Sequence, residues 1–134
     1  AFLIRTAHLL QSTARMYNTK DQSTALALFD IERASLDVLL VEADFGQLDA
    51  EVMKVMVQAL TSDESKELLS ARVSLVERER LYTKLRVRAS DCYGDEDPLT
   101  AASNYCLAYV YERQKRYKET LEFFECALAV RRKA

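Results

Sequence analysis

Apolar residues recur at helical spacing along most of the chain. Leu3, Ala7, Leu10, Ala14 and Tyr17 follow one another at alternating steps of four and three, which is the stripe of a helix packed on one face. Further stripes predict five more helices, over residues 22–46, 48–60, 64–93, 98–114 and 117–133. No segment alternates strictly between apolar and polar residues as a half-buried strand does. The pattern therefore predicts an all-α protein.

Glycine, proline and polar capping residues divide these stripes. Gly46 and Gly94 are expected to cap the C-terminal ends of the second and fourth helices in a left-handed conformation. Thr61 and Glu64 are spaced as a capping box at the start of the fourth helix. Pro98 follows three acidic residues and suits the first position of the fifth helix.

The six predicted helices form three hairpins, because short loops make consecutive helices antiparallel neighbours. We place these hairpins at about residues 2–45, 48–93 and 97–133 of a single domain, 1–134. One hairpin is too small to bury its own apolar face, so stacking should produce a short solenoid with a continuous core.

The last hairpin has the small and aromatic residues of a tetratricopeptide repeat. Leu107 and Ala108 are followed by Tyr111, a short turn, Phe124 and Ala127. Ala108 would allow close approach of the paired helix, while Tyr111 and Phe124 would fill the space between the helices. The resemblance implies tetratricopeptide-like hairpins stacked as a right-handed solenoid.

Two longer segments resemble more specific families of repeat-containing proteins. Residues 93–98 and 127–133 are similar to the extended repeats of kinesin light chains and nephrocystin-like proteins, and Leu85-x-Val87-Arg88 recurs 43 residues later from Leu128. Residues 25–36 resemble the segment that precedes the repeats in signal-transduction ATPases of the NB-ARC type, with Ser35 replacing an asparagine. If the parent protein is such an ATPase, its nucleotide domain lies outside this chain. Without the resemblance, residues 25–36 are a helix with Asp30 and Arg33 in water.

A candidate binding face lies on the fifth helix, opposite the residues that the repeat motif assigns to packing. Ala102, Tyr105, Tyr109 and Glu112 share this face and are expected to line the concave side of the solenoid. Two tyrosines beside an acid form a surface typical of interfaces. The alternative is that both tyrosines pack against a neighbouring repeat.

These features predict a protein-interaction module, a helical-repeat scaffold or sensor segment of a larger signalling protein, whose partner is a protein or peptide. One alternative is a cargo adaptor of the kinesin-light-chain type, although Tyr105 and Cys106 stand where that family has the paired asparagines that hold a peptide backbone. A structural subunit of a large assembly is another alternative.

The composition and the absence of certain motifs argue against several other classes of function. A formal net charge of −2 argues against nucleic-acid binding, and the apolar stretches are too short to cross a membrane. Three cysteines without a Cys-x-x-Cys pair are typical of reduced thiols in a cytoplasmic protein. No phosphate-binding glycine loop occurs, and His8 has no partner at a metal-ligand spacing. We therefore expect no catalytic residues, no cofactor and no metal.

The first twenty residues contain basic side chains and no acid, which also suits a transit peptide. Their regular apolar stripe favours an ordinary packed helix over that alternative.

Overall fold

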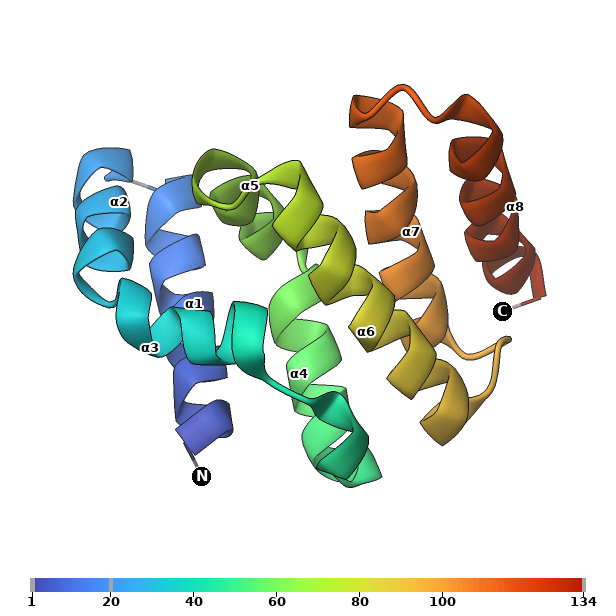
Figure 1. Ribbon diagram of the computed structural model, residues 1–134, viewed down its shortest axis with the longest axis horizontal. Helices are drawn as coiled ribbons and strands as arrows, with labels where there is room; N and C mark the ends of the chain where they lie inside the picture. Colours follow the sequence, from blue (N-terminus) through green and yellow to red (C-terminus); the bar gives the residue numbers. More distant parts are fainter. Residues whose placement is uncertain (1, 20, 134) are drawn as a thin grey trace.

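The computed structural model describes residues 2–19 and 21–133, and every regular element within these ranges is helical (Figure 1). The prediction of an all-α chain is confirmed for this part. The elements are α1 (Phe2–Thr19), α2 (Gln22–Ile31), α3 (Arg33–Asp37), a π-helical turn η1 (Val38–Glu42), a 3₁₀ turn η2 (Phe45–Gln47), α4 (Ala50–Thr61), α5 (Asp63–Arg72), α6 (Leu75–Tyr93), α7 (Pro98–Arg113) and α8 (Tyr117–Lys133).

The helices are laid out in a row, with α1 and α2 at one end and α7 and α8 at the other (Figure 1). Helix α1 packs against α2, and α7 packs against α8. The middle hairpin differs from its prediction: α4 contacts α6, and the intervening α5 packs mainly against α1. Helix α7 also packs against α6 and α4, which joins the last hairpin to the rest.

The predicted stripe of α1 lies in the core. Ala7, Leu10 and Ala14 are fully buried, and Leu3 and Tyr17 are partly buried against the same cluster. Within the described residues, α1 is therefore a packed helix. Lys20, one of the basic residues of this N-terminal segment, lies outside the described residues.

The helix predicted over residues 22–46 is broken. It is interrupted at Glu32, whose backbone (φ −92°, ψ 11°) ends α2 and begins α3. The π-helical turn η1 ends at Glu42. Gly46 lies inside η2 without a positive φ, so the expected left-handed cap is absent, and its N–H donates to Asp44 Oδ1. The break brings Arg33 back toward the molecule, where its Nε donates to Asp37 and its Nη1 to the carbonyl of Arg72. Arg33 is therefore only partly in water, with 35% of its side chain exposed, and not free as expected.

The helix predicted over residues 64–93 is also two helices. Val73 and Ser74 adopt extended conformations between α5 and α6, and Val73 is buried. Ser74 then caps α6 by accepting from Glu77 N, at an N-cap that the sequence analysis missed. The predicted capping box is shifted as well: Ser62, not Thr61, accepts from Ser65 N at the start of α5.

The caps around α7 agree with their prediction. Gly94 ends α6 with a positive φ of 87°, Asp97 accepts from Leu99 N, and Pro98 occupies the first turn of α7. Ala108 is fully buried, as expected for a close helix crossing.

Cationic side chains of α6 bind carbonyl groups of earlier segments. Arg78 Nε donates to Val73 O at 3.0 Å, Lys84 Nζ to Ala43 O at 2.9 Å, and Arg88 Nη2 to Leu48 O at 2.6 Å. These bonds satisfy carbonyls that end helical segments or lie in loops, and they hold α6 across the middle of the row.

Two apolar clusters make up the interior of the described residues. The main cluster extends from Ala7 on α1 to Tyr111 on α7. A second cluster contains Ala101, Ala127 and Val130 beneath Tyr105, and it joins α8 to α7.

Candidate functional site

The residues expected to share one face of α7 do share it. Ala102 and Tyr105 are half-buried, Tyr109 is 42% exposed, and Glu112 is exposed. Steps of three and four place these side chains on one side of the helix, while Leu107, Ala108 and Tyr111 are buried. The predicted separation into a packed side and an accessible side is therefore present on α7.

Tyr105 and Tyr109 form an aromatic cluster with Phe124 of α8. The ring centroids lie 5.1 Å apart for the two tyrosines and 5.3 Å from Phe124 to each, all in edge-to-face geometry. The Tyr105 and Tyr109 hydroxyls lie 3.4 Å apart, and this hydrogen bond, together with burial, raises the pKa of Tyr109. Phe124 was expected to pack with Tyr111, but Tyr111 contacts Phe123 instead.

Two cations from other helices lie against these rings. Lys66 Nζ, on α5, is 5.1 Å from the centroids of both Tyr105 and Tyr109. The Arg131 guanidinium carbon, on α8, is 4.9 Å from the Tyr105 ring. Asp63 Oδ1 lies 3.0 Å from Lys66 Nζ and holds it in place. A cation over a tyrosine face contributes roughly 0.5–1 kcal/mol at an accessible site such as this one, so the rings and cations stabilise one another modestly.

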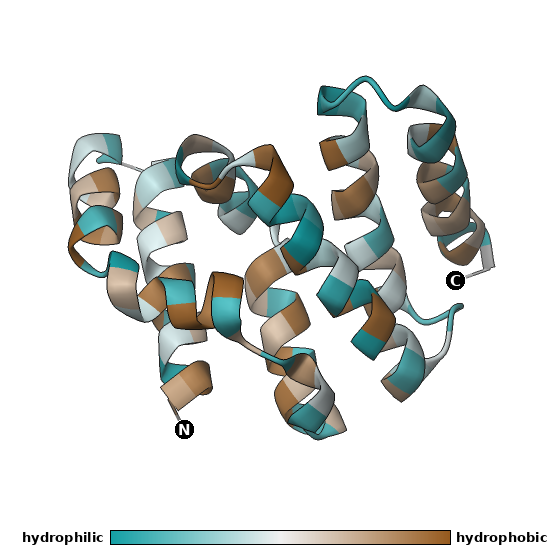
Figure 2. Ribbon diagram, in the orientation of Figure 1, coloured by the Kyte–Doolittle hydropathy of each residue, from teal (hydrophilic) through white to brown (hydrophobic). Residues whose placement is uncertain are grey.

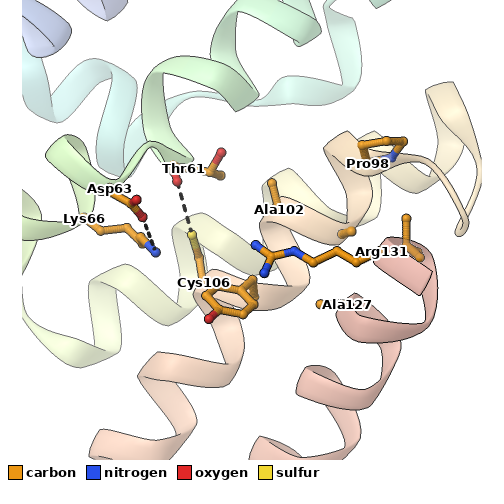
Figure 3. Close-up of a pocket in the computed structure, with 11 residues that line it drawn as sticks. Thr61, Asp63, Lys66, Pro98, Ala102, Cys106, Ala127 and Arg131 are labelled. Atoms are coloured by element: carbon orange, nitrogen blue, oxygen red, sulfur yellow. Dashed lines mark hydrogen bonds and ion pairs between the residues drawn. The ribbon is translucent and has the colours of Figure 1, made fainter. Parts of the chain in front are cut away.

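Two adjoining cavities flank this cluster, and we call them together the α7 groove. One has a volume of about 320 Å³ and the other about 430 Å³, and both are bordered by Asp63, Lys66 and Cys106. Ala102 and Tyr105 line the first, whereas Tyr109 and Glu112 line the second. In the first cavity, Arg131 extends from α8 and Lys66 from α5 (Figure 3). Its remaining lining residues are Thr61, Pro98, Ala101, Ala127 and Val130.

Cys106 lies at the base of the groove, where α7 meets α4. Its Sγ donates to Thr61 O at 3.9 Å, and burial raises the pKa of this thiol to about 12. A thiol with this pKa remains protonated at neutral pH and is a poor nucleophile. Tyr82, which also borders the groove, donates to Leu60 O at 3.3 Å, and burial raises its pKa well above the ordinary value.

Lys66, Asp63 and Arg131 were not among the residues predicted to form the site. No local signal marked Lys66, because its approach to α7 depends on the break at Val73–Ser74 that separates α5 from α6. Arg131 could have been found from helix geometry, since it follows Phe124 by seven residues and lies on the same side of α8.

Two further features, a metal site and a membrane span, were sought in the part of the chain that the structure describes. His8 is exposed on α1, and no three His, Cys, Asp or Glu side chains in residues 2–19 and 21–133 are grouped to hold a metal ion. None of the described helices is long and apolar enough to cross a membrane.

Comparison with protein-family models, with curated proteins and with solved structures found no match to this chain. The function is therefore inferred from the arrangement of its side chains.

Proposed function

We propose that this chain is a protein-interaction module that binds a segment of a partner protein in the α7 groove. The observation that carries this proposal is the meeting of Lys66, Tyr109 and Arg131 around one aromatic cluster. These residues come from three helices and line two adjoining cavities. Tyrosine and arginine are the residue types that most often dominate binding energy at protein interfaces.

The chemistry of the groove suits a peptide better than a small substrate. It combines apolar walls with cations and carboxylates spread along its length, so successive side chains of a bound segment can each meet a different surface. The only thiol among its lining residues, Cys106, is held protonated, which supports binding rather than catalysis.

The stacking of α6 on α7 and of α7 on α8 supports a tetratricopeptide-like solenoid, with α7 as the inner helix of the last hairpin. On this view the chain is a scaffold or sensor segment of a larger signalling protein, as the likeness of residues 25–36 to NB-ARC-type ATPases implies. An adaptor of the kinesin-light-chain type is the second candidate, and it is favoured by the recurrence of Leu85-x-Val87-Arg88 at Leu128.

Cys92, Cys106 and Cys126 are all unpaired in the structure. Free thiols, one of them exposed, are typical of a reducing compartment, and we place the module in the cytoplasm as part of this proposal.

A random peptide library displayed on phage tests the groove directly. We expect the immobilised chain to select peptides that bind with a micromolar Kd, measured by fluorescence polarisation. Tyr109→Ala should weaken them about 30-fold, because truncating one central anchor typically costs ~2 kcal/mol. Lys66→Ala should weaken them by a smaller factor, since it removes one cation from the wall.

The matched control is Ile31→Ala on α2, which removes a side chain that is 75% exposed and lies outside the groove. Tyr105 is a poorer probe, because it packs on the small cluster of Ala101, Ala127 and Val130 and its loss would loosen α8. Selected peptides that bind Tyr109→Ala and the parent chain equally would remove the groove as the binding site.

A further inference from the structure

A second apolar surface lies along α8 beside the aromatic cluster of the α7 groove, and the half-buried Phe124 belongs to both. Tyr117, Leu121, Phe124 and Leu128 follow at steps of four, three and four, which places them within an arc of about 60° on the helix. Tyr117 and Leu121 are each 62% exposed, and Leu128 is 41% exposed. The apolar segments of α8 are visible in Figure 2. We call these four residues the α8 stripe.

The stripe differs from the equivalent face of α6. The 43-residue recurrence pairs Leu128 with Leu85 and Phe124 with Leu81, and both of these α6 leucines are fully buried. In α6 that face is covered by the rest of the row, whereas α7 is the only extensive neighbour of α8 among the described helices. Leu128 is thus exposed where its α6 counterpart is buried, whereas Tyr117 and Leu121 replace the polar Ser74 and Arg78 of α6.

Charged residues beside the stripe indicate which partner surface can pair with it. Lys118 and Glu125 are both exposed, lie seven residues apart and flank the stripe on the same side. When two such helices pair in antiparallel orientation, Lys118 of one faces Glu125 of the other, and the twofold axis produces this ion pair twice. The same pairing places Leu121 against Phe124 and Tyr117 against Leu128 of the second helix. A parallel pair would not bring the two charges together.

We propose that the α8 stripe is a self-association surface, through which two copies of this chain pair antiparallel along α8. The interface is isologous: the first half of the stripe on one copy contacts the second half of the stripe on the other copy. Four apolar side chains bury less area than a standard interface, and the dimer should therefore be weak, with a Kd of about 10–100 µM.

Sedimentation of the 134-residue chain under reducing conditions tests the proposal, since the exposed Cys126 is then kept from forming disulfides. The parent chain should be mainly dimeric at about 500 µM and mainly monomeric at about 5 µM, as the expected Kd requires. Leu121→Glu should weaken the dimer at least tenfold, because it places a charge in the centre of the contact. Val76→Glu is the matched control, a 54% exposed apolar residue on α6, and should leave the dimer unchanged.

Charge reversal tests the orientation. Lys118→Glu and Glu125→Lys should each weaken the dimer by roughly three- to tenfold, because each places like charges across the twofold axis. The double variant restores opposite charges and should return to within about twofold of the parent. A parent chain that is monomeric at about 500 µM would overturn the proposal. A double variant that dimerises no more tightly than the single variants would also overturn it. None of these substitutions touches a residue that lines the α7 groove.

Discussion

The two ends of the row are built differently. At the N-terminal end, α1 is enclosed by α2, α4 and α5, and its buried face belongs to the main core cluster. At the C-terminal end, α8 packs mainly against α7 through Ala101, Ala127 and Val130, and Phe123 packs against the edge of the main cluster. The first end derives its stability from burial, whereas the second leaves tyrosines, cations and an apolar stripe accessible. Both surfaces that we propose for binding therefore lie at the end of the row where the core is thinnest.

Phe29→Ala should produce the largest loss of stability and test the N-terminal half of this comparison. Phe29 is fully buried on α2, and truncating a buried phenylalanine costs about 3–5 kcal/mol in transfer energy and cavity formation. Urea unfolding followed by circular dichroism measures the change. Ile31→Ala, two residues later but 75% exposed, should shift the free energy of unfolding by less than about 0.5 kcal/mol. Similar losses in both variants would mean that α2 is not packed as described.

Ala108→Leu should have an intermediate effect at the C-terminal end. Ala108 is fully buried on the face of α7 that packs, so a larger side chain must push a neighbouring helix away at a cost of about 1–3 kcal/mol. Amide hydrogen exchange should show faster opening of α7 and α8 than of α1 and α4. The exposed Ala129 on α8 provides the control substitution Ala129→Leu, which should change little. Unchanged urea midpoints for Ala108→Leu would place the helix crossing elsewhere.

Cys106→Ala should have the smallest effect on the free energy of unfolding, and this effect should depend on pH. Burial raises the pKa of its thiol from 9.0 to about 12, so the thiol stabilises the fold fully below pH 9, where it is protonated in both states. As the pH rises above 9, the unfolded thiol ionises while the folded one does not, and stability falls by up to about 1.4 kcal/mol per pH unit. Replacing Cys106 by alanine should remove this dependence between pH 9 and 10, measured by urea unfolding at each pH. An equal slope for Cys106→Ala and the parent would show that the thiol is accessible, and the exposed Cys126 serves as the control.

Local patterns were sufficient where a helix begins and ends with its own capping groups. Gly94, Asp97 and Pro98 determine the junction of α6 and α7, and each acts on backbone groups within a few residues of itself. The burial of Ala7, Leu10 and Ala14 could be predicted for a similar reason, since a strong stripe has only one favourable side to bury.

The two missed breaks required information from distant parts of the chain. At Glu32 the chain turns so that Arg33 reaches Arg72 O and so that Asp30 Oδ1 lies 3.0 Å from Arg72 Nε. The break at Val73–Ser74 buries Val73 and frees α5 to pack on α1. Both segments have continuous helical patterns, but contacts between helices outweigh the small propensity that favours continuing a helix.

The sequence by itself determined that the chain is helical, where α1, α7 and α8 lie, and which side of α7 carries Tyr105 and Tyr109, because helical periodicity and end caps act over a few residues. Only the tertiary structure decided which side chains meet that face. Lys66 and Arg131 reach the tyrosine rings because α5 and α8 are placed on either side of them. Such an arrangement depends on the packing of whole helices, which the spacing of residues along one helix does not encode.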